Sequence, residues 1–200
     1  MWKSDLNIIV KNPYVKHISL YALTIEEHSE FGRNHIKKCD DDLEADFYDY
    51  AISYLSQYGF QQYEISNFSK EGFESKHNQM YWNYADFYGL GCGASGKENH
   101  VRYDQEKNIY HYIQGNSVSN NIVLSKEDEM FEMIMMGLRL KKGINILAFN
   151  QRFQINFKEH YKEVLDKLSL KKWIVCNDTN CYVTESGMHF LHDVLILFLN

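Results

Sequence analysis

The feature that most constrains the fold is an amphipathic helix predicted between two short strands early in the chain. Asp40-Asp41-Asp42 can cap a helix start, and Gly59 stands where a left-handed C-cap belongs. Strands are predicted at 17–23 and 63–66, so the order strand, helix, strand indicates a parallel sheet in an α/β fold. Apolar residues spaced three and four apart draw the buried helix face: Leu43, Phe47, Tyr50, Ala51, Tyr54, Leu55 and Tyr58.

The C-terminal residues predict a separate, mainly helical domain. Ser125 begins a capping signal, and a four-residue polar loop joins two short β-segments, which is typical of a hairpin. Three helices, a hairpin and a helix together indicate a small winged-helix-like unit. The predicted segments are helices at 129–140, 146–153 and 158–170, hairpin strands at 173–176 and 181–183, and a last helix at 184–199.

Charge is distributed unevenly and places a domain boundary near residue 120. Residues 1–120 carry 11 basic and 17 acidic side chains, whereas residues 121–200 carry 10 of each. We therefore expect domains at 1–120 and 121–200, joined by the polar linker 116–121. The net charge of -6 argues against a nucleic-acid or anionic-membrane binder, because phosphate neutralisation needs a basic face.

Neither the cysteines nor the apolar runs indicate secretion or membrane insertion. The four cysteines form no CxxC pair, so we expect reduced thiols, with no disulfide framework and no zinc site. The longest apolar run, 194–199, is far shorter than the roughly 20 residues of a membrane helix. The N-terminus has no signal-peptide pattern. We expect a cytoplasmic protein without an integral membrane segment.

Residues 66–103 are predicted to be irregular, and such a long stretch usually builds a site. His77 offers an imidazole nitrogen that can bind iron, and Asn78 could orient a ring. Tyr81 and Trp82 could pack against a flat macrocycle. The alternative is that the polar pair bonds loop backbone while the aromatic pair fills the core. Spacing alone favours this alternative.

A glycine-rich segment follows the histidine motif and also allows two interpretations. Gly89, Gly91, Gly93 and Ala94 could let the backbone approach a ligand closely. They could equally serve tight turns. Their spacing does not match the dinucleotide fingerprint GxGxxG.

Several motifs in fixed order resemble the later half of the HemW-type radical-SAM haem chaperones, relatives of the oxygen-independent coproporphyrinogen III oxidases. The resemblance covers about residues 14–199. Its motifs are HISLYALTIEE from His17, DLEAD from Asp42, YEISNF from Tyr63, GFESKHN from Gly72, YW at Tyr81 and YGLGCGA from Tyr88.

The resemblance implies a fold and a set of site residues. It implies the last βα units of a partial parallel (β/α) barrel, followed by a HemN C-terminal-type domain. The family motif HNxxYW maps onto His77, Asn78, Tyr81 and Trp82, with His77 as the axial haem ligand. The family loop GxGxGA, near S-adenosylmethionine, maps onto Gly89, Gly91, Gly93 and Ala94; this list completes the implied site.

One departure from the family limits the expected chemistry. The CxxxCxxC motif that holds the family's [4Fe–4S] cluster is absent from these 200 residues. We expect cluster binding and reductive cleavage of S-adenosylmethionine only in the full-length family, and no enzyme activity from this chain alone.

The favoured hypothesis is a haem-binding C-terminal part of a haem chaperone, with haem or porphyrin and a haem-acceptor protein as partners. Two alternatives stay open, a fragment of a coproporphyrinogen III oxidase and a winged-helix module for nucleic acid or protein. A barrel piece without its early strands would expose a sheet edge, so we also expect a homodimer.

Overall fold

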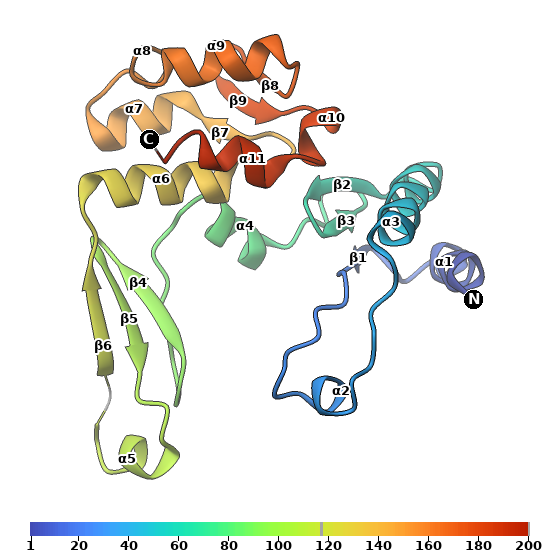
Figure 1. The fold of residues 1–200 in the computed structure, drawn as a ribbon, viewed down its shortest axis with the longest axis horizontal. Coiled ribbons are helices and arrows are strands. Elements are labelled where there is room, and N and C mark those ends of the chain that lie inside the picture. Colours follow the sequence, from blue (N-terminus) through green and yellow to red (C-terminus); the bar gives the residue numbers. More distant parts are fainter. Residues whose placement is uncertain (117, 200) are drawn as a thin grey trace. The chain divides into compact units, whose positions relative to one another are not determined.

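The computed structural model describes residues 1–116 and 118–199 and shows an α/β fold (Figure 1). The chain forms two compact units, Met1–Ser75 and Lys76–Asn200, called unit 1 and unit 2 below. The α/β class predicted from the sequence is confirmed.

Unit 1 contains three helices and a three-stranded sheet in the order β1-β3-β2. The long helix predicted after Asp40 is confirmed, and the Asp40 side chain accepts a hydrogen bond from the Asp42 N–H at 3.0 Å. The elements are α1 (Trp2–Lys11), β1 (His17–Ser19), α2 (Glu30–Arg33), α3 (Asp41–Ser56), β2 (Gln61–Glu64) and β3 (Asn67–Ser69).

The prediction that the strands on either side of α3 pair in a parallel sheet is wrong. Strands β1 and β2 do run in the same direction, but β3 lies between them and is antiparallel to both. A tight turn after Glu64 folds β3 back onto β2, with Gln61 opposite Ser69. The strand at 67–69 carries a single apolar residue, Phe68, so hydrophobic alternation gave no signal for it.

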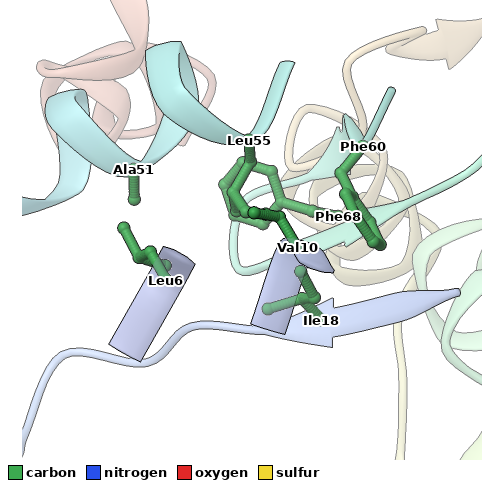
Figure 2. Close-up of a cluster of buried hydrophobic side chains, with 7 residues drawn as sticks. All are labelled: Leu6, Val10, Ile18, Ala51, Leu55, Phe60 and Phe68. Atoms are coloured by element: carbon green, nitrogen blue, oxygen red, sulfur yellow. The ribbon is translucent and has the colours of Figure 1, made fainter. Parts of the chain in front are cut away.

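The core of unit 1 lies between α1, α3 and the sheet. Figure 2 shows Leu6 of α1 facing Ala51 of α3. Val10 of α1 lies beside Leu55 of α3 and Phe68 of the sheet. Helix α1 was not predicted, although its two buried residues stand four apart, as a buried helix face requires. The cluster consists of Leu6, Val10, Ile18, Ala51, Leu55, Phe60 and Phe68.

Unit 2 begins with a helix and a three-stranded antiparallel meander in the order β4-β5-β6. The expectation of an irregular stretch to residue 103 is therefore wrong in part, because α4, β4 and most of β5 lie in it. Of the expected linker 116–121, residues 118–121 belong to β6, Asn116 lies before it, and Ser117 lies outside the described residues. The elements are α4 (Lys76–Trp82), β4 (Ser95–Glu98), β5 (Val101–Gln105), α5 (Ile109–Ile113) and β6 (Val118–Val123).

The rest of unit 2 follows the predicted order of helices and hairpin. Ser125 forms the predicted cap, with its hydroxyl accepting from the Asp128 N–H at 3.1 Å. The predicted last helix is broken into two at Phe190. The elements are α6 (Lys126–Gly137), β7 (Ile144–Asn145), α7 (Ile146–Phe153), α8 (Phe157–His160), α9 (Lys162–Leu170), β8 (Ile174–Cys176), β9 (Asn180–Val183), α10 (Glu185–Met188) and α11 (Leu191–Ile196).

The boundary expected near residue 120 falls inside β6, which hydrogen-bonds to β5. The compact units instead divide between Ser75 and Lys76. Compact units and inherited domains need not coincide, so the domain ranges 1–120 and 121–200 stay a prediction. In the part of the chain that the structure describes, no helix is long and apolar enough to span a membrane.

Truncating the centre of the unit 1 core tests this packing. Leu55 is 0% exposed, and Leu55→Ala should lower the free energy of unfolding by about 2–5 kcal/mol, because it leaves a cavity. Leu43 lies on the same helix but is 43% exposed, so Leu43→Ala should change it by no more than about 0.5 kcal/mol. Urea titrations followed by circular dichroism measure both, and equal losses would contradict the assigned core.

Candidate functional site

The histidine motif lies on helix α4 rather than in a loop. His77 and Tyr81 stand four residues apart, as do Asn78 and Trp82, so each pair shares a side of the helix. The helix therefore brings all four predicted residues into one surface region. Their common placement is observed, whereas their role in binding haem is not tested by it.

His77 is exposed and lies beside an aromatic pair. Its ring meets Tyr81 edge-on, with the ring centroids 5.0 Å apart, and Tyr81 meets Phe87 edge-on at 4.7 Å. Phe87 is fixed by two backbone hydrogen bonds with Lys97, so the aromatic pair rests on the meander. The geometry presents an accessible imidazole nitrogen next to an apolar wall.

Trp82 carries a polar atom without a partner. Its indole Nε1 is buried, and no acceptor for it occurs among the residues that the structure describes. The Arg139 guanidinium lies over the indole ring at 5.9 Å from its centroid. Burial lowers the pKa of Arg139 from its ordinary value. A buried N–H donor without an acceptor is rare in native proteins and marks a place where a ligand oxygen could bind.

A cavity of about 270 Å³ lies next to the motif helix, between the meander and α6. Its volume is just below the range of about 300–1,000 Å³ that is usual for small-molecule pockets. Aromatic and methionine side chains form much of its wall, and charged groups enter it from the meander and from α6. The lining includes Tyr81, Phe87, Met135, Met136, Arg102 and Glu132.

A buried carboxylate of helix α6, that of Glu132, lines the cavity. Glu132 accepts a hydrogen bond from the Tyr84 hydroxyl at 2.7 Å and pairs with Arg102 at 3.2 Å. Burial and this hydrogen bond raise the pKa of Tyr84 above its ordinary value. Tyr84 also has a φ of 57°, a left-handed conformation that is costly for a bulky residue and clusters at functional sites.

Lys97 is a further charged residue that lines the cavity, and it is only 2% exposed. Its ammonium group pairs with Asp86 at 2.8 Å and lies 4.2 Å from the centroid of the Tyr84 ring. Burial raises the pKa of Asp86, but the bonds from Lys97 and the Asn99 N–H lower it below its ordinary value overall. The lysine charge is thus satisfied inside the protein.

A second buried carboxylate, that of Glu129, forms further ion pairs beside Tyr84. Glu129 contacts His100 Nδ1 at 2.8 Å and Arg152 at 3.0 Å. Arg152 also lies over the Tyr84 ring, 4.9 Å from its centroid. Glu129 and Glu132 together connect α6 to the meander, to Tyr84 and to α7. The sequence analysis missed this network, because its members are far apart in the chain.

The glycine segment begins with a residue, Gly89, that is packed tightly against the meander. A Cβ on Gly89 would lie 2.5 Å from the Ser95 carbonyl oxygen, which excludes any larger residue there without backbone movement. Gly91 and Gly93 have φ values of 104° and 73°. The Gly93 and Ala94 N–H groups donate to carbonyl oxygens within the protein. These contacts support the turn interpretation, and a cofactor role for this segment stays a prediction.

Known proteins resemble this chain in sequence over most or all of its length. Residues 124–190 match the HemN C-terminal domain. The heme chaperone HemW of Lactococcus lactis is 32% identical over 206 residues, which cover 100% of this chain and 54% of that protein. HemW of Bacillus subtilis is 30% identical over 195 residues, covering 92% and 51%. The chain spans about half the length of the curated relatives it matches.

A solved structure described as coproporphyrinogen III oxidase (HemN) from Escherichia coli, a radical SAM enzyme, has the same fold. The TM-score is 0.76 at 16% identity, over 98% of this chain and 50% of that chain. This likeness shows the fold, and within it residues 124–190 match the HemN C-terminal domain. More narrowly, the chain is homologous to the C-terminal part of the HemW heme chaperones, as its motifs predicted.

Removing one hydroxyl tests the buried network. Tyr84→Phe leaves the Glu132 carboxylate without its 2.7 Å donor, so the free energy of unfolding should fall by about 1–3 kcal/mol. Tyr88 is 70% exposed, and Tyr88→Phe makes the same chemical change with an effect of no more than about 0.5 kcal/mol. Chemical denaturation of both variants measures the difference. A network that does not stabilise the fold would give two indistinguishable values.

Proposed function

We propose that this chain is the haem-binding C-terminal part of a HemW-like haem chaperone. The observation that carries the proposal is the exposed His77 imidazole on α4, set beside Tyr81 and Phe87 at the rim of a cavity. A haem supplies its own ring nitrogens to iron, so one histidine suffices as a protein ligand. Relatives that this chain matches are described as heme chaperones.

Each motif residue has a distinct part in this proposal. His77 ligates the iron, while the Tyr81 and Phe87 rings cover an apolar edge of the macrocycle. The Trp82 indole, whose Nε1 is buried, supports the site from within the protein, and Asn78 orients the bound group. The cavity of about 270 Å³ is too small to enclose a whole porphyrin, so the haem lies at the surface with one edge toward the cavity.

The radical chemistry of the family belongs, in this proposal, to the remainder of the longer relatives. There the [4Fe–4S] cluster and S-adenosylmethionine would be held, with the loop at Gly89, Gly91, Gly93 and Ala94 near the latter. Residues 1–120 would supply the last part of a partial parallel (β/α) barrel. Residues 121–200 would form a winged-helix-like domain that docks a haem-acceptor protein, in the cytoplasm. The comparisons favour neither the oxidase nor the nucleic-acid alternative.

A haemin titration tests the proposed ligand. The purified chain should shift the Soret band saturably, and His77→Ala should abolish the shift because the iron loses its protein nitrogen. His111→Ala is the matched control, since His111 is also an exposed helical histidine of unit 2 and should leave the shift unchanged. A shift that persists in His77→Ala, or none in the parent chain, would remove the proposal.

The edge strand β1 provides a separate prediction. Among the residues that the structure describes, strand β1 is hydrogen-bonded on one side only, to β3, so we propose that its other edge pairs with a second copy of the chain. Sedimentation velocity should show a concentration-dependent dimer. Ser19→Pro should weaken it, because Ser19 forms a non-hydrogen-bonded pair with Asn67, so its N–H faces the free edge and proline removes that donor. A monomer at all concentrations would contradict the pairing.

A further inference from the structure

Two cysteines face each other across the C-terminal hairpin. Cys176 ends β8 and Cys181 lies near the start of β9, and the strand register pairs them directly. They are separated in the sequence only by the hairpin loop 177–180, so their proximity depends on the fold of that loop rather than on distant packing. The other two cysteines, Cys39 and Cys92, lie outside this hairpin.

The hydrogen-bond pattern fixes the kind of pair that the cysteines form. The Asn177 N–H donates to the Asn180 carbonyl at 2.9 Å, and the Thr184 N–H donates to the Trp173 carbonyl at 2.9 Å. In an antiparallel ladder, hydrogen-bonded and non-hydrogen-bonded pairs alternate. The cysteine pair adjoins the first of these bonded pairs and is therefore a non-hydrogen-bonded pair.

This kind of pair meets the distance requirement of a disulfide. Non-hydrogen-bonded partners have Cα atoms about 4.5 Å apart, with their side chains close together. A disulfide needs Cα atoms about 4.4–6.8 Å apart. The register places the two cysteines directly opposite each other, so their side chains lie on the same face of the hairpin. Closing the bond thus requires side-chain rotation and only small backbone adjustment.

The two thiols differ in exposure and acidity. Cys181 is 0% exposed, whereas Cys176 is partly exposed beside the loop. The hydrogen bond from Cys181 and the nearby Lys158 charge lower the pKa of Cys176, although burial opposes them. The same hydrogen bond and burial raise the pKa of Cys181. Cys176 is therefore the thiol that can attack as a thiolate.

We propose that Cys176 and Cys181 form a redox-active dithiol, which a low-molecular-weight disulfide of the glutathione type oxidises to a cross-strand disulfide. The Cys176 thiolate attacks the oxidant, breaks its S–S bond, forms a mixed disulfide and releases one thiolate. Cys181 then loses its proton and attacks the Cys176 sulfur, displacing the second thiolate. Two protein thiols lose two electrons and two protons, and one small disulfide becomes two small thiols.

The proposal does not depend on haem binding and assigns a modification site within the HemN C-terminal domain. The disulfide would close a loop of only a few residues, so the entropic stabilisation of the fold is small. The informative readout is therefore the state of the thiols rather than a melting temperature.

The experiment uses the full chain with Cys39→Ser and Cys92→Ser, so that the hairpin holds the only thiols. The chain is equilibrated with mixtures of reduced and oxidised glutathione, quenched with an alkylating agent and weighed intact. The oxidised product should be lighter by two hydrogen atoms and carry no glutathionyl or alkyl group. Adding Cys181→Ser should instead trap one glutathionyl group at Cys176, and adding Cys176→Ser should prevent both products.

Three results would overturn the proposal. One is alkylation of both hairpin thiols even in a large excess of oxidised glutathione. Another is a disulfide that joins two chains instead of two strands. The third is equal trapping of glutathione in the Cys176→Ser and Cys181→Ser chains, which would remove the assigned order of attack. The chain with Cys39→Ser and Cys92→Ser alone decides the first two, so they hold even where a further serine substitution in the hairpin prevents folding.

Discussion

Unit 2 depends on the ion pairs and hydrogen bonds that two buried carboxylates of α6, Glu129 and Glu132, make with groups of other elements. Glu129 is 4% exposed and Glu132 is 8% exposed, and an unpaired charge at such depth would be strongly destabilising. Their partners come from the meander, from α7 and from the segment after α4: Arg102, His100, Arg152 and Tyr84. Satisfying both charges therefore requires these elements to assemble around one helix, and the cavity walls follow from that assembly.

The position of the histidine motif is a consequence of the same network. Tyr84 turns the chain in a left-handed conformation two residues after α4 ends, while its hydroxyl is held by Glu132. The chain then returns so that Phe87 pairs with the buried Lys97. Tyr81 packs on Phe87, and His77 packs on Tyr81. A ligand at the imidazole would thus bind to an aromatic wall fixed by buried charges, which is the preorganisation that a binding site needs.

Sequence patterns predicted the elements that carry local signals and missed those that depend on distant partners. Helix α3, the cap at Ser125 and the C-terminal hairpin have caps, periodicity or turn residues of their own, and they were predicted closely. Strand β3 and the meander have little apolar alternation, so they were missed. The network was invisible because Glu132 and Tyr84 are 48 residues apart. One local signal was available, since Glu132 stands three and four residues before Met135 and Met136, so it shares a side of α6 with two apolar residues.

The central claim is that the His77 imidazole is the protein ligand of a bound haem. The most direct measurement is the resonance Raman spectrum of the ferrous haem complex of His77→Gly, recorded without and with added imidazole. The account predicts that the iron–nitrogen stretching band of the parent chain is absent from the variant and returns when imidazole occupies the vacated position. A variant that shows the parent band without imidazole would place the ligand elsewhere and contradict the account.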